Sequence, residues 1–167
     1  MVQARVAKKD PEAIRFLGQK YCFGNLGLRK DIRKAVELFT EAAELGSIDA
    51  LCRLGDAYFQ NEGVQQDMAK AVEFYTKAAI QGHVVSRHNL GCIVAQKGKH
   101  NHAVRHFLIS AKMGLEISVE NIKKLLLRGI ATKEQYAEAL KGYQDAVGEM
   151  KSHDRDEANA LGMRMGK

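Results

Sequence analysis

Three cysteines are the side chains of this 167-residue sequence with the clearest potential for metal or redox chemistry: Cys22, Cys52 and Cys92. An odd number of cysteines leaves at least one thiol unpaired. Residues 1–10 also lack the apolar core of a secretory signal, so we expect reduced thiols. Free cysteines mostly pack as small hydrophobic residues. We therefore favour packing over a shared metal or redox site.

Histidines form the second candidate group, because five of the six lie between residues 83 and 106. His102 and His106 are four residues apart, a spacing that places two imidazoles on one face of a helix. Two ligands leave a tetrahedral metal site half empty, and no glutamate lies between them as in the HExxH pattern. We therefore predict no metal site and interpret these histidines as part of a solvated, mildly basic surface.

Other catalytic patterns are absent from the sequence. No nucleophile, base and orienting group occur at a recognisable spacing. The glycine-containing segment 24–27 lacks the lysine of a phosphate-binding loop. The sequence therefore predicts no enzyme activity, no catalytic residue, no cofactor and no small-molecule substrate.

Basic residues are concentrated in one segment, residues 83–128, which has eight Lys and Arg against two Glu and so a formal charge of +6. The whole chain also has a net charge of +6, so the remainder is neutral. A basic segment attracts acidic peptides, nucleic acids or anionic membranes. Nucleic-acid-binding surfaces often place aromatic side chains, on which bases stack, among the basic ones, and this segment has no such pattern. We therefore favour an acidic protein partner or a solvated surface. The basic side chains are Arg87, Lys97, Lys99, Arg105, Lys112, Lys123, Lys124 and Arg128.

The elements that position these side chains repeat along the chain. The pair Leu54-Gly55 recurs 37 residues earlier and 36 residues later, and Gly46 recurs as Gly82 and Gly114. Apolar residues at helical spacing on both sides of a polar, glycine-containing break predict two antiparallel helices in each copy. Two short helices bury too little apolar area to be stable alone, so the copies must stack.

The repeated pattern A-x-x-x-L-G-x-x-Y, followed by D-x-x-K-A-V-E and K-A-A-x-x-G, resembles the Sel1-like repeat, a relative of the tetratricopeptide repeat. The second copy matches best, and the third departs from the pattern because Val94 replaces the Tyr and Ser110 replaces an Ala. The matching residues of the second copy are Ala50, Leu54, Gly55, Tyr58, Gly63, Val64, Asp67, Lys70, Ala71, Lys77, Ala78, Ala79 and Gly82.

The expected fold is all-α, a right-handed α-α superhelix (solenoid) of stacked antiparallel helix pairs. Three Sel1-like repeats (residues 10–46, 47–82 and 83–114) precede a C-terminal capping helix pair (115–150). We expect residues 1–150 to form one domain, with the first helix beginning at Pro11. Residues 151–167 mix charge, Gly and Met without an apolar stripe, which predicts a disordered tail.

The resemblance implies a non-enzymatic scaffold or adaptor that holds a protein or peptide in the concave groove lined by the first helix of each repeat. We expect the groove-lining side chains to be those that point away from the paired second helix. Polar side chains would clamp a peptide backbone, charged ones would select the partner, and Phe23 would be an apolar anchor. The predicted groove residues are Arg15, Gln19, Cys22, Phe23, Arg53, Asp56, Gln60, His88, Asn89, Cys92 and Gln96.

Two alternative functions stay open at the level of sequence. Sel1-like repeats occur in ubiquitin-ligase assemblies beside RING modules, so the chain could be the substrate-recognition part of such an assembly. The basic segment 83–128 could instead bind nucleic acid, and this would make binding strongly salt dependent. No run of about 18 apolar residues occurs, so we expect no membrane partner and a cytoplasmic or nuclear location.

Overall fold

The computed structural model describes residues Val2–Met165. In this part of the chain the regular secondary structure is all helical, with turns and loops between the helices and no strand. The chain divides into two compact units, Met1–Leu90 (unit 1) and Gly91–Lys167 (unit 2), and the division falls within helix α6. The helices are α1 (Val2–Ala7), α2 (Pro11–Phe23), α3 (Ile32–Glu44), α4 (Ile48–Gln60), α5 (Met68–Ile80), α6 (Val84–Gln96), α7 (His100–Lys112), α8 (Glu116–Leu127) and α9 (Lys133–Met165).

Local side chains explain where the helices of unit 1 begin and end. The Asp10 carboxylate accepts hydrogen bonds from two free N–H groups of α2, and Pro11 occupies the first helical position, where its missing N–H costs nothing. Ser47 and Asp67 cap α4 and α5 in the same way. Helix α2 ends at Gly24, which has a left-handed φ of 66°.

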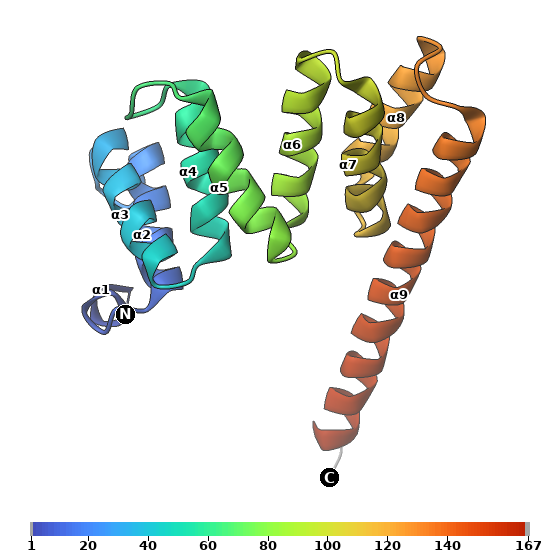
Figure 1. The fold of residues 1–167 in the computed structure, drawn as a ribbon. Helices are drawn as coiled ribbons and strands as arrows, with labels where there is room; N and C mark the ends of the chain where they lie inside the picture. The colour runs from blue at the N-terminus through green and yellow to red at the C-terminus, as the bar shows by residue number, and fades with distance from the viewer. Residues whose placement is uncertain (1, 166–167) are drawn as a thin grey trace. The chain divides into compact units, whose positions relative to one another are not determined.

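In each of the two helix pairs of unit 1, a glycine of the first helix faces an aromatic ring of the second helix. A Cβ atom added to Gly18 of α2 would lie 2.8 Å from the ring of Phe39 on α3. A Cβ atom added to Gly55 of α4 would lie 2.6 Å from the ring of Tyr75 on α5. The rings are almost fully buried, with 3% and 2% of their residues' surface exposed. Each glycine therefore makes room for a ring, and α2 lies against α3 and α4 against α5 (Figure 1).

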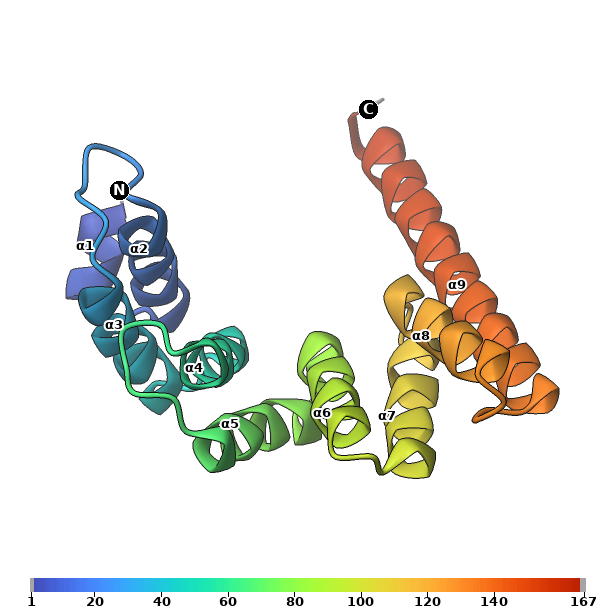
Figure 2. The ribbon, with the colours of Figure 1, turned by 90° about the horizontal axis from the view of Figure 1, so that it is seen from above.

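Unit 2 has its own core, in which α7, α8 and α9 pack against one another. Figure 2 shows α8 and α9 lying side by side. Gly91 faces the ring of Phe107 in the same arrangement as in unit 1, with 2.7 Å between an added Cβ and the ring. Ser110, which replaces an Ala of the repeat, is buried and its hydroxyl is 2.7 Å from that of Ser118. This hydrogen bond satisfies two polar groups that burial would otherwise penalise.

Sequence reasoning placed the beginning of a helix at Pro11, where α2 begins, because the start signal is local. It missed α1, which precedes this helix. Helix α9 continues to Met165, beyond residue 150, with exposed side chains at 151–154. The disordered tail at 151–167 and the single domain at 1–150 stay predictions, and residues 166–167 lie outside the described part.

Candidate functional site

Unit 1 contains a cavity of about 310 Å³ between α2, α3 and α4. We call it the unit 1 cavity. It gathers six of the eleven predicted groove residues, and these come from the first helices of two successive repeats. The cavity is lined by Gln19, Cys22, Phe23, Lys30, Ile32, Val36, Phe39, Arg53, Asp56, Ala57, Gln60 and Glu62.

The floor of the unit 1 cavity is apolar, and much of it comes from α3. Phe39 and Ala57 are buried, while Ile32 and Val36 are half-buried. Sequence reasoning missed the α3 contribution because it assigned the groove to first helices alone. The loop of the second repeat lies close to this floor, since a Cβ added to Gly63 would lie 2.7 Å from Cγ2 of Ile32. That loop therefore packs on the start of α3.

Asp56 is held by three side chains of unit 1. Its Oδ1 accepts a hydrogen bond from the Tyr75 hydroxyl at 2.7 Å and one from Asn89 Nδ2 at 3.4 Å. Its Oδ2 lies 3.4 Å from an Arg53 guanidinium nitrogen. Burial and the neighbouring Asp56 carboxylate together raise the pKa of Tyr75 far above its usual value, so the hydroxyl stays protonated and donates. Asp56 and Asn89 therefore hold α4, α5 and α6 together and are less available to a partner than the sequence suggested.

The three cysteines are free thiols with low reactivity. Burial raises the pKa of each, and for Cys52, which is 5% exposed, to about 11. The nucleophilic form is the thiolate, so these pKa shifts reduce the reactivity of the sulfur atoms at neutral pH. Cys22 lines the unit 1 cavity, whereas Cys92 belongs to unit 2, where Asn121 Nδ2 lies 3.9 Å from its sulfur. These environments agree with the packing interpretation.

The other predicted groove residues do not line the unit 1 cavity. The Arg15 guanidinium is 2.7 Å from a Glu12 carboxylate oxygen and 3.7 Å from Asp49. His88 is buried, and burial lowers its pKa. Gln96 is exposed in unit 2. Six predicted groove residues of the first two repeats therefore line one cavity, and Asn89 of the third repeat contacts one of them, Asp56.

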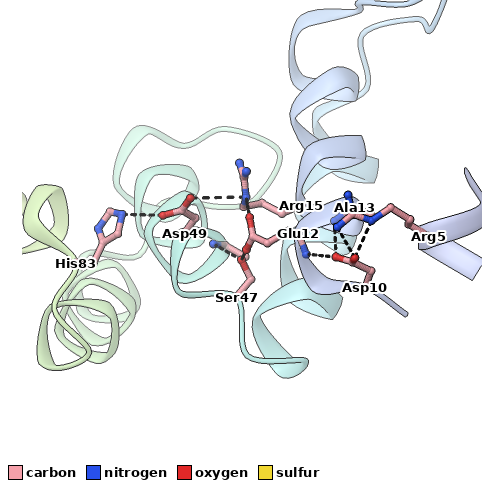
Figure 3. Close-up of polar contacts among 9 residues, drawn as sticks. Arg5, Asp10, Glu12, Ala13, Arg15, Ser47, Asp49 and His83 are labelled. Carbon is pink, nitrogen blue, oxygen red and sulfur yellow. Dashed lines mark hydrogen bonds and ion pairs between the residues drawn. The ribbon is translucent and has the colours of Figure 1, made fainter. Parts of the chain in front are cut away.

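A series of polar contacts links the first helices of unit 1 at their N-terminal ends (Figure 3). Glu12, in the first turn of α2, accepts a 2.5 Å hydrogen bond from Ser47, the N-cap of α4. Asp49, in the first turn of α4, lies 3.1 Å from Nε2 of His83, which directly precedes α6. The Ser86 N–H points at His83 Nδ1, so that nitrogen is the acceptor and Nε2 carries the proton donated to Asp49.

These contacts follow one rule that sequence reasoning missed. An acidic residue in the first turn of one repeat pairs with the side chain just before the first helix of the next repeat. The third repeat breaks the rule, because Val85 stands where an acid would be and Leu115 caps α8 without a side-chain hydrogen bond. The signal was the matching position of Glu12 and Asp49 in the first two repeats.

The histidine and basic residues of unit 2 form no comparable site. His102, Arg105, His106 and Ile109 line a shallow hollow of about 220 Å³ on α7. Within the described residues, no three His, Cys, Asp or Glu side chains are placed to hold one metal ion. Lys112 is paired with Glu138 at 2.5 Å. In unit 1, Arg87 donates a hydrogen bond to the Ala79 carbonyl at 3.1 Å, so two of the eight basic side chains have partners within the fold.

Comparisons with known proteins identify one kind of repeat. The family model described as the Sel1 repeat matches residues 11–47 and 48–83. Among solved structures, the chain is similar to a protective antigen of uropathogenic Escherichia coli strains that displays an SLR fold. The identity is 29%, 89% of this chain is covered and the TM-score is 0.72. It is also similar to a Sel1 repeat protein from Oxalobacter formigenes, with 23% identity, 89% coverage and a TM-score of 0.73.

These likenesses confirm the predicted fold class, an all-α solenoid of helix pairs. The chain spans 32% of the length of the first of these proteins and 62% of the second. No curated protein matches the sequence significantly. In the part of the chain that was searched, none of the helices has the length and apolar character needed to cross a membrane.

Proposed function

We propose that this chain, in which residues 11–47 and 48–83 match the Sel1 repeat, is a non-enzymatic adaptor that binds a partner protein or peptide in the unit 1 cavity. Proteins built from Sel1 repeats are generally scaffolds for protein–protein interactions. The observation that carries the proposal is the convergence of Gln19, Cys22 and Phe23 of α2 with Arg53 and Gln60 of α4 around one hollow.

The chemistry of the unit 1 cavity suits a protein ligand better than a reaction. Its only thiol, Cys22, has a raised pKa because it is partly buried and lies near Glu62, so it is a poor nucleophile. Asp56 is occupied by Tyr75, Asn89 and Arg53 and is not placed as a free base. The unit 1 cavity has an apolar floor and polar side chains around it. It therefore resembles the small pockets that bury a large side chain of a partner at protein–protein interfaces.

Affinity capture with matched variants tests this proposal. The full chain, Arg53→Glu and Arg128→Glu would each be immobilised and incubated with cell extract, and retained proteins identified by mass spectrometry. Both variants make the same charge change, but Arg53 lines the unit 1 cavity and Arg128 lies in the basic segment of unit 2. We expect a partner that Arg53→Glu loses and Arg128→Glu keeps. Direct binding of that purified partner would then be measured by calorimetry.

The opposite pattern would contradict the proposal. Loss of the partner with Arg128→Glu alone would place binding on the basic segment 83–128, and recovery of nucleic acid there would favour the second alternative from the sequence. Retention of every partner by both variants would exclude the unit 1 cavity as the binding site. The ubiquitin-ligase alternative stays a prediction that the identity of the captured partner tests.

A further inference from the structure

Two side-chain amides line the unit 1 cavity without a hydrogen-bond partner among the described residues. They belong to Gln19 on α2, which is half-buried, and Gln60 on α4, which is exposed. A carboxamide carries one acceptor oxygen and an NH₂ donor, the same pair of groups as a peptide bond. Each amide can therefore accept from an N–H and donate to a C=O of a bound backbone.

An extended backbone offers these groups along its whole length. In a helix the N–H and C=O groups are already paired within the segment, apart from those at its ends. An extended chain leaves them free, and burying them without partners would cost free energy. Amides on two successive first helices therefore favour an extended segment over a helical one.

Apolar surface lies between these polar groups. The floor of Phe39 and Ala57 is buried, and Phe23 at the rim is 66% exposed. A volume of about 310 Å³ is at the small end of the range for ligand pockets, about 300–1,000 Å³. It accommodates one large side chain with a short length of backbone.

The formal charges around the unit 1 cavity cancel. Lys30 and Arg53 are positive, and Asp56 and Glu62 are negative. Arg53 and Asp56 are close enough to form an ion pair, and Lys30 and Glu62 both lie near the Cys22 thiol, where they shift its pKa in opposite directions. A balanced set of charges gives little attraction for an acidic ligand, unlike the basic segment of unit 2.

We infer that the unit 1 cavity binds an extended peptide segment with no net charge that buries one large apolar side chain against Phe23, Phe39 and Ala57, with its backbone held by Gln19 and Gln60. The inference rests on the proposed function and states the chemical class of the partner. It also separates the cavity from the basic segment, whose chemistry suits acidic partners.

Peptide selection tests the inference. Random dodecapeptides displayed on phage would be selected on the full chain, and the resulting peptides synthesised and measured by fluorescence anisotropy. We expect peptides that share one Leu, Met or Phe and carry no net charge. Replacing that residue by Ala should weaken binding at least about tenfold. Affinity should change less than about threefold between about 50 and 500 mM salt, because no net charge is neutralised.

Variants of the chain locate the contacts. The double variant Gln19→Ala, Gln60→Ala removes two backbone clamps and should weaken binding about 30-fold, while Phe23→Ala should weaken it about tenfold. Gln96→Ala is the matched control, because Gln96 occupies the position of Gln60 in the next repeat and does not line the unit 1 cavity. Bound peptide should also slow alkylation of Cys22 and leave Cys92 unaffected. Circular dichroism confirms that each variant is folded.

Three results would overturn the inference. The first is a set of selected peptides without a shared apolar residue, or with an acidic consensus that salt weakens. The second is equal loss of affinity in Gln96→Ala and in the double variant. The third is failure to select any peptide when a captured protein is still lost with Arg53→Glu. In the third case the adaptor proposal stands and the ligand is a folded surface, whereas failure of both experiments removes the adaptor proposal as well.

Discussion

Replacing Gly55 by Ala tests whether the helix pairs depend on rings packed over glycines. The added Cβ would lie 2.6, 2.6 and 3.0 Å from three ring atoms of Tyr75. The ring is 2% exposed and its hydroxyl is hydrogen bonded to Asp56, so it has little freedom to move. Overpacking a core costs about 1–3 kcal/mol, and contact with a fixed ring places this case near about 3 kcal/mol. Ala recovers about 1 kcal/mol through its helix propensity, so we expect a net loss of about 2 kcal/mol.

Gly148→Ala is the matched control. Gly148 is also inside a helix, α9, but no atom lies within 4 Å of its added Cβ. This variant should therefore gain up to about 1 kcal/mol from helix propensity alone. Urea unfolding followed by circular dichroism measures both changes. Hydrogen exchange should show about 30-fold faster opening of α4 and α5 in Gly55→Ala, since about 2 kcal/mol corresponds to that factor.

A double-mutant cycle identifies the ring as the cause. In a Tyr75→Leu background no ring opposes residue 55, so Gly55→Ala should cost nothing or stabilise slightly. The reasoning is refuted if Gly55→Ala is as favourable as Gly148→Ala in the wild-type background. It is also refuted if the cost is the same with Tyr75 and with Leu at position 75.

Three further perturbations probe the polar contacts and the buried groups. Ser47→Ala removes the α4 N-cap and the hydrogen bond to Glu12, so the free energy of unfolding measured in urea should fall by about 1–2 kcal/mol. Ser47→Thr keeps a hydroxyl and should restore most of this loss. A Ser47→Ala variant as stable as the wild type would contradict the contact. Burial lowers the pKa of His88 below its usual 6.5, so the unfolded chain binds a proton first and stability falls as the pH drops below about 6.5. His88→Gln should reduce this pH dependence of unfolding, and an unaltered slope in this variant would disprove the assignment. Cys52, whose pKa is raised by burial to about 11, should be alkylated more slowly than Cys22 or Cys92 in native protein, and mass spectrometry showing Cys52 modified first would be incompatible with its burial.

Much of the fold could be predicted from local sequence. Asp10 and Pro11 mark the start of α2, and the glycines at 46, 82 and 114 mark the ends of the three repeats with positive φ values of 98°, 89° and 90°. These signals act over a few residues, so no knowledge of the tertiary structure was needed. Phe39, Tyr75 and Phe107 each lie seven residues before one of these glycines, so an aromatic residue recurs at one position of the repeat, and the structure places each ring against Gly18, Gly55 or Gly91.

The candidate site was less predictable, because it depends on which side chains bind each other. Helical projection identified Arg15, Asp56 and Asn89 as equally available groove residues. The structure shows Arg15 paired with Glu12 and near Asp49, and Asp56 held by Tyr75 and Asn89. Helical spacing shows which side of a helix a residue occupies, but it does not show which residue of another helix lies opposite.

The sequence by itself determined the repeat, its helix pairs and the glycines that end each copy, since caps, glycine stops and apolar periodicity act within single helices or turns. Only the tertiary structure decided that α3 completes the floor of the unit 1 cavity and that Asp56 is occupied. The contacts responsible join residues far apart in sequence: Tyr75 and Asp56 are 19 residues apart, and Ser47 and Glu12 are 35 apart. Such pairs meet only after the helices have packed, so their geometry depends on the whole unit.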